Sequence, residues 1–140
     1  MKQYISLSAK ETKTLGTKIA KEIKAGVIIL TGELGAGKTT FVQGFAKGLG
    51  IKEKIMSPTF VLIRQHQIPS SDKIFYHIDL YRLEEEMELN NLGLLDLWSN
   101  PKNIIIIEWG EKIKDLPKGN IKISIQKENL HQRKFLIQNS

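Results

Sequence analysis

The sequence predicts an α/β fold: a single domain over residues 1–140 with a mixed parallel and antiparallel sheet flanked by helices. Three observations lead to this prediction. Segments with helical spacing surround a short apolar run in the first half of the chain. The second half holds β-branched runs separated by turn residues. A chain of 140 residues, 41% of them hydrophobic, is long enough to form one hydrophobic core but too short to form two domains comfortably.

The first helix is predicted from a capping box. Ser8 and Glu11 have the S-x-x-E spacing, and the apolar positions Leu15, Ile19 and Ile23 follow at helical intervals. We expect this helix to stop near residue 26. The β-branched run "VIILT", residues 27–31, then predicts a strand buried on both faces.

A second helix is expected to begin at the lysine and threonines of "GKTT" and to end at Gly48 or Gly50. Its inward positions are predicted to be Phe41, Val42, Phe45, Ala46 and Leu49.

The remaining elements are mostly strands. The runs "FVLIRQHQI" and "IFYHIDLY", joined by "PSSDK", predict an antiparallel pair. "LEEEMELNNLGLLDLW" is expected to be helical, with Leu83, Met87 and Leu95 buried. "NIIIIEW" predicts another central strand, and "IKISIQ" with "KFLIQ" a C-terminal hairpin.

Composition excludes several classes of function. With no cysteine there is no disulfide, thiolate metal site or cysteine nucleophile. No apolar run approaches the roughly 20 residues of a membrane span, and the N-terminus lacks the apolar core of a signal peptide, so we expect a cytoplasmic protein without membrane contact. The net charge of +6 comes mainly from scattered lysines, which favours compositional bias over a nucleic-acid surface.

One motif carries strong chemical information. Residues 32–39, "GELGAGKT", fit G-x-x-x-x-G-K-[ST], the phosphate-binding loop, and lie between a predicted strand and helix. Glycines let backbone N–H groups approach phosphate oxygens, and the helix N-terminus adds donors and a partial positive charge. Lys38 is expected to reach the β- and γ-phosphates, and the Thr39 hydroxyl to ligate Mg²⁺. We therefore predict a P-loop NTPase-like domain that binds a nucleoside triphosphate.

Phosphoryl transfer also needs a carboxylate at the end of a neighbouring strand. Glu108 follows "NIIII" and Asp79 follows "IFYHI". We favour Glu108 for the metal, and Asp79 for the metal's water shell or the attacking water. Thr59 in "SPTF" is either a switch-type residue that returns to the metal and γ-phosphate or part of a simple proline turn, and the two interpretations are equally weighted.

Features missing from the sequence narrow the chemistry. There is no N-K-x-D motif for reading guanine, and three scattered arginines do not suggest the arginine-bearing lid of a small-molecule kinase. His66, His77 and His131 lack metal-ligand spacing and are interpreted as structural or surface residues. Trp98 and Trp109 are most simply core or edge aromatics.

Four segments in register, "GELGAGKTTF", "SPTF", "HIDLYRL" and "IEWGE", resemble the TsaE (YjeE) family. The resemblance spans about three quarters of the chain, from "LSAKET" to "IEWGE". It implies a P-loop domain that hydrolyses ATP slowly with Mg²⁺. It also implies that the partners are the TsaD and TsaB proteins, which form threonylcarbamoyladenosine beside the anticodon of tRNA. The role implied for this chain is to reset that complex between turnovers. Contact with tRNA is expected through the complex.

The resemblance also suggests residue roles. It implies that Lys38, Asp79 and Glu108 are catalytic and that Thr39 and Glu108 hold the metal. The nucleotide-binding residues that it implies are Gly35, Ala36, Gly37, Lys38, Thr39, Thr40, Ala9, Thr12, Thr59, Trp109 and Arg133. Within this set, the segment from Ala9 to Thr12 is expected near the adenine, and Arg133 is expected to approach from the C-terminal strands.

Three hypotheses remain open at this point. The chain is an ATPase inside a tRNA-modifying complex, a metabolite kinase, or a nucleotide-dependent switch in which occupancy carries the signal. A kinase would require a phosphoryl acceptor and a closing lid, whereas the ATPase and the switch differ in whether hydrolysis is needed.

Overall fold

The computed structural model describes residues 2–23, 25–33, 35–53, 63–81, 93–113 and 116–139. In chain order the elements are β1 (Lys2–Ser6), α1 (Ala9–Glu22), β2 (Gly26–Gly32), α2 (Lys38–Gly48), β3 (Ile63–Gln67), β4 (Ile74–Asp79), α4 (Leu94–Ser99), β5 (Asn103–Glu108), the 3-10 turn η1 (Gly110–Lys112), β6 (Ile121–Lys127) and β7 (Arg133–Asn139).

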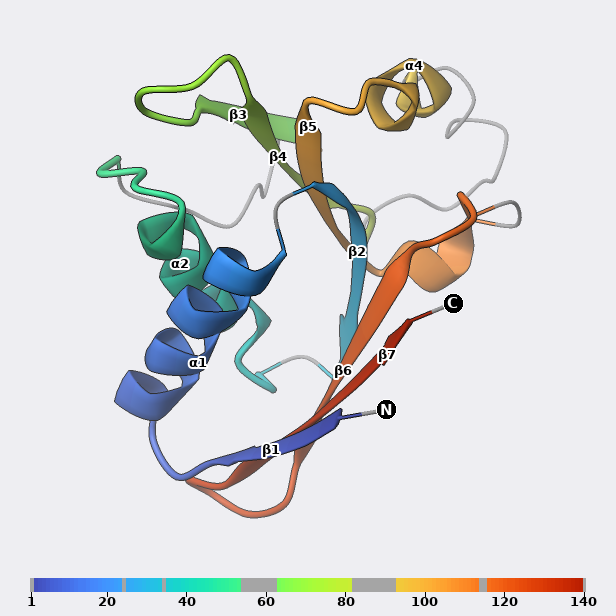
Figure 1. Cartoon of the computed structure of the whole chain (residues 1–140). Coiled ribbons are helices and arrows are strands. Elements are labelled where there is room, and N and C mark those ends of the chain that lie inside the picture. Colours follow the sequence, from blue (N-terminus) through green and yellow to red (C-terminus); the bar gives the residue numbers. More distant parts are fainter. Residues whose placement is uncertain are drawn as a thin grey trace.

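The strands form one seven-stranded sheet in the order β1-β7-β6-β2-β5-β4-β3 (Figure 1). Its centre is parallel, because β2 pairs in parallel with both β5 and β6, and β5 with β4. The outer pairings, β3 with β4, β6 with β7 and β1 with β7, are antiparallel. The predicted mixed sheet and both predicted antiparallel pairs are therefore confirmed.

The predicted ends of the first two helices are close to the observed ones. Ser8 caps α1 by accepting a hydrogen bond from the Glu11 backbone N–H at 3.1 Å, and the Glu11 carboxylate accepts one from the Leu7 N–H at 3.4 Å. The helix ends at Glu22, slightly earlier than expected. α2 ends at Gly48, and Gly50 follows with a left-handed φ of 88°.

β1 is a strand that the sequence analysis missed. Its hydrophobic pattern is misleading, because the apolar Ile5 is 51% exposed while the polar Ser6 is buried. The strand exists because it pairs with β7, where Tyr4 lies opposite Phe135 and Ser6 opposite Arg133. This stabilisation comes from a segment about 130 residues away, and local alternation does not reveal it.

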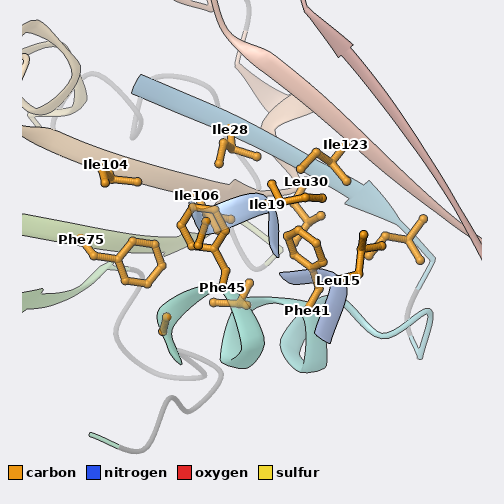
Figure 2. Close-up of a cluster of buried hydrophobic side chains, with 14 of the residues drawn as sticks. Leu15, Ile19, Ile28, Leu30, Phe41, Phe45, Phe75, Ile104, Ile106 and Ile123 are labelled. Carbon is orange, nitrogen blue, oxygen red and sulfur yellow. The ribbon is translucent and has the colours of Figure 1, made fainter. Parts of the chain in front are cut away.

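The sheet is covered on both faces. α1 and α2 lie together on one side (Figure 1), and Figure 2 shows Phe41 and Phe45 of α2 pointing toward the strands that carry Leu30 and Ile106. On the other face, Leu94 of α4 and the partly buried Trp98 pack with isoleucines of the central strands. No helix in the described ranges is both long and apolar enough to cross a membrane.

One burial prediction was wrong. Leu95 was expected in the core, but it is 65% exposed. α4 begins only at Leu94, and within this six-residue helix Leu94, Leu97 and Trp98 share the inward face. Leu95 is one step round the helix from Leu94 and points away. Leu83 and Met87 lie outside the described residues.

α1 and α2 are in direct backbone contact. A Cβ built on Gly44 would lie 2.1 Å from the Lys13 carbonyl oxygen, and one on Gly16 would lie 2.4 Å from the Phe41 carbonyl oxygen. These distances are well below any real Cβ contact, so only glycine permits this approach. The Thr17 hydroxyl adds a bond across the interface by donating to the Gly44 carbonyl oxygen at 2.9 Å.

Gly44→Ala is therefore expected to destabilise the protein by about 1–3 kcal/mol, because the added methyl must push two backbones apart. In an ordinary helix interior the same change stabilises by roughly 0.5–1 kcal/mol. Urea unfolding measures the difference. Lys47→Ala, an exposed change on the same helix, is the control and should stay within about 0.5 kcal/mol of the parent chain. A Gly44→Ala variant as stable as the control would contradict the close packing.

Candidate nucleotide-binding site

The phosphate-binding motif forms the connection between β2 and α2. Gly35 and Gly37 have left-handed φ values of 79° and 101°, and Gly37 is the N-cap of α2. A turn is closed by the Ala36 N–H, which donates to the Glu33 carbonyl oxygen at 3.0 Å. The first N–H groups of an α-helix have no acceptor within the helix. The start of α2 therefore presents donors and a partial positive charge at the loop.

Lys38 is buried at this point, with 6% of its surface exposed. Its Nζ donates to the Gly32 carbonyl oxygen and lies 4.1 Å from the centroid of the Trp109 ring. Burial lowers the pKa of Lys38, and the nearby carboxylates of Glu108 and Asp79 partly oppose that shift. The Lys38 amine is thus a poorly hydrated cation, which a nearby anion would stabilise.

Two carboxylates end neighbouring parallel strands. Asp79, the last residue of β4, lies directly opposite Glu108, the last residue of β5. Glu108 is 3% exposed, and its carboxylate accepts a hydrogen bond from Nε2 of the buried His77. Asp79 is half-buried and accepts the Tyr81 backbone N–H at 3.0 Å. Desolvation raises the pKa of Asp79, and this outweighs the opposing effect of that hydrogen bond.

Trp109 turns the chain sharply after β5. Its φ of 62° is left-handed, which is strained for a bulky residue and costs about 1–3 kcal/mol. The ring packs against Tyr81 at a centroid distance of 5.2 Å and covers the Lys38 amine. The strained turn therefore places the ring beside the loop, and the ring also packs partly buried against the core, as predicted for a core or edge aromatic.

Arg133 contacts the loop from the C-terminal hairpin. Its Nε donates to the Ala36 carbonyl oxygen at 3.1 Å, and its Nη2 to the Gly35 carbonyl oxygen at 3.5 Å. Its Nη1 donates to the Asn129 carbonyl oxygen at 3.0 Å within the hairpin turn. The guanidinium thus joins the hairpin to the loop backbone.

The remaining predicted site residues lie on α1 and α2 or outside the described residues. Thr39 and Thr40 are half-buried in the first turn of α2, and Ala9 is exposed at the start of α1. Thr12 is buried, and its hydroxyl shares a 2.7 Å hydrogen bond with the Ser6 hydroxyl. Thr59 lies outside the described residues.

Two residues at the site were not predicted. His77 was interpreted as an ordinary structural histidine, and Tyr81 was not considered. The one available signal for His77 was its position two residues before Asp79, on the same face of a strand. Among the described residues no group of three or more His, Cys, Asp or Glu side chains forms a metal cluster.

A glycine-rich loop between a central parallel strand and a helix, inside a mixed sheet, defines the P-loop NTPase-like fold. A family model described as threonylcarbamoyl adenosine biosynthesis protein TsaE matches residues 6–135. The chain therefore belongs to the TsaE family.

Individual relatives agree with this assignment. The chain is 38% identical to the tRNA threonylcarbamoyladenosine biosynthesis protein TsaE of Bacillus subtilis over 141 residues, covering 96% of this chain and 85% of that protein. It is 44% identical to the protein of the same name from a Nostoc species over 127 residues, covering 85% and 75% of the two chains. A crystal structure of Bacillus subtilis YdiB superimposes with a TM-score of 0.75 and 29% identity, covering 96% of this chain and 82% of that one.

The raised pKa of Asp79 leads to a stability prediction. In the unfolded chain this carboxyl ionises near 3.8, and in the folded chain at a higher pH. Folding therefore disfavours the ionised form, and that penalty develops as the pH rises above the unfolded value. Asp79→Asn removes the penalty, so the variant should unfold at a higher temperature than the parent chain at pH 7.

The gain should vanish at about pH 3, where Asp79 is protonated in both states. Thermal unfolding followed from pH 3 to pH 7 tests both halves of this expectation. Asp96→Asn, at an exposed position, provides the control for removing a carboxylate. An Asp79→Asn variant that is less stable at pH 7, or equally shifted at both pH values, would contradict the assigned cause.

Proposed function

We propose that this chain is a Mg²⁺-dependent ATPase that supports the TsaD–TsaB pair in forming threonylcarbamoyladenosine next to the anticodon of tRNA. Its slow hydrolysis of ATP resets that complex between turnovers, and tRNA is contacted through the complex. Membership of the TsaE family supports the pathway. The observation that carries the proposed chemistry is the meeting of the buried Lys38 with Asp79 and Glu108 beside a phosphate-binding loop.

In this proposal residues 35–40 bind the phosphates. The backbone N–H groups at the start of α2 donate to phosphate oxygens, and Lys38 exchanges the Gly32 carbonyl oxygen for the β- and γ-phosphates. This exchange favours binding, because burial disfavours the Lys38 charge and phosphate supplies compensating negative charge. Trp109 then shields these contacts from water, which strengthens them.

The donor set suits Mg²⁺. This ion takes oxygen ligands, keeps several waters and binds through one or two carboxylates together with substrate phosphates. The Thr39 hydroxyl and the Glu108 carboxylate would supply the protein oxygens. When bound, the ion neutralises charge on the β- and γ-phosphates.

Asp79 is the proposed group that orients the attacking water or the water shell of the metal. Its raised pKa makes it a stronger proton acceptor than an ordinary aspartate, and its place opposite Glu108 keeps it at the same sheet edge. The two acids then divide the work, with Glu108 toward the metal and Asp79 toward water.

The remaining proposed contacts lie around this centre. Ala9 and Thr12 are proposed near the adenine, Arg133 and Trp109 beside the nucleotide, and Thr59 as a switch-type residue. Arg133 has support from its hydrogen bonds to the Ala36 and Gly35 carbonyl oxygens.

Lys38→Ala is expected to weaken ATP binding at least about 100-fold, since each tenfold loss corresponds to about 1.4 kcal/mol and the phosphates lose a buried cation. Isothermal titration with ATP and Mg²⁺ measures the change. Lys47→Ala removes an exposed lysine from the same helix and should bind ATP like the parent chain. Unchanged ATP affinity in Lys38→Ala would overturn the site assignment.

Glu108→Gln separates hydrolysis from occupancy. This variant should bind ATP and the TsaD–TsaB pair, yet lower ATP turnover by about 100-fold and stop repeated modification cycles, because a carboxylate needed in the transition state is lost. The measurement counts modified tRNA per complex alongside released phosphate. Glu111→Gln, at an exposed position close enough to influence Lys38, is the control. Continued cycling with Glu108→Gln would favour the switch hypothesis instead.

A further inference from the structure

The buried contact between His77 and Glu108 has no place in the function proposed above. His77 lies on β4 and is completely buried, while Glu108 ends β5 with 3% of its surface exposed. His77 pairs across the sheet with Ile106, two residues before Glu108. The two side chains are therefore diagonal neighbours on one face of a parallel pair.

The direction of this hydrogen bond follows from its partners. An ionised carboxylate offers only acceptors, so Nε2 of His77 donates to Oε2 of Glu108. The other ring nitrogen, Nδ1, is buried without a partner among the described residues. The ring thus makes its hydrogen bond to Glu108 and, being completely buried, is held in place otherwise by packing.

Stability alone accounts poorly for this arrangement. Burying a hydrogen-bonded polar pair contributes little net stability compared with packed apolar side chains, and an unpartnered Nδ1 adds a cost. Phe75, two residues before His77 on β4, and Ile106, opposite His77 on β5, are fully buried and apolar, so a pair of apolar side chains at positions 77 and 108 would suit this core. What the contact does provide is geometric: it occupies one carboxylate oxygen and limits the rotamers of Glu108.

We propose that His77 is a positioning residue, which fixes the Glu108 carboxylate by binding Oε2 and leaves Oε1 directed at the nucleotide site. This inference rests on the proposed role of Glu108. His77 touches neither phosphate nor water in this scheme, and it acts only through Glu108. Partners that orient ligand side chains in this way change metal affinity or activity by about 10- to 100-fold when removed.

The test compares three single variants, one double variant and one control. His77→Leu removes the donor and keeps an apolar volume, whereas His77→Gln places an amide N–H at the position of Nε2. Glu108→Gln removes the partner charge. His66→Gln is the matched control. His66 lies on the adjacent strand β3, and its ring also contacts a carboxylate, that of Glu53, at 3.1 Å.

Turnover is expected to fall about 10- to 100-fold in His77→Leu, with ATP affinity within about twofold of the parent chain. His77→Gln should recover most of that loss, and His66→Gln should match the parent. In the Glu108→Gln background, His77→Leu should cause no further loss, because its effect passes through Glu108. Equal fold-losses in both backgrounds, or no rescue by His77→Gln, would overturn the proposal.

A second readout needs no nucleotide. His77→Leu leaves the Glu108 carboxylate buried and unpaired, so it should lower the unfolding temperature, and adding Glu108→Gln should recover part of that loss. Identical shifts in both backgrounds would exclude a direct coupling. If the parent chain shows no ATP turnover, the proposed function fails, whereas the coupling of His77 to Glu108 is still decided by unfolding.

Discussion

The parallel register of β2, β5 and β4 is the constraint on which the site depends. Leu30 and Asp79 both lie opposite Glu108, and the loop begins two residues after Leu30. A slip of one residue between two of these strands would send the Glu108 carboxylate to the opposite face. The four identical isoleucines of β5 fill both faces and favour no single register. The polar residues at the two ends of this run do, because a slip would break the hydrogen bond from Asn103 to the Leu97 carbonyl oxygen and the contact of Glu108 with His77.

The same burial that fixes the site also makes it costly. It lowers the pKa of Lys38 and raises that of Asp79, so both groups are held in a less favourable environment than water. The left-handed backbone of Trp109 adds strain. Such features persist when the surrounding structure over-determines them, as the two hydrophobic clusters on either face of the sheet do here. An anionic ligand at the loop would relieve the part of this cost that falls on Lys38, because it supplies the negative charge that the buried amine lacks.

The parts of this structure that local patterns specify could be predicted from the sequence. The capping box of α1, the buried run of β5 and the phosphate-binding loop each depend on residues within one short segment. The failures depend on distant partners or on rotation about a helix axis. β1 requires β7, and the bond from His77 to Glu108 requires knowing which strands pair. Leu95 was misplaced because a leucine next to a helix start can face either way.

The glycine contacts between α1 and α2 have a mechanical consequence. With carbonyl oxygens meeting at Gly44 and Gly16, no flexible side chain lies between the two backbones to absorb a displacement. We therefore expect the two helices to move together. A shift at the start of α2 would then be carried along α1 to Thr12, and through the hydroxyl of Ser6 to the edge strand β1. The edge strand β1 would thus be mechanically coupled to the loop, so that a change in the position of the loop displaces this strand.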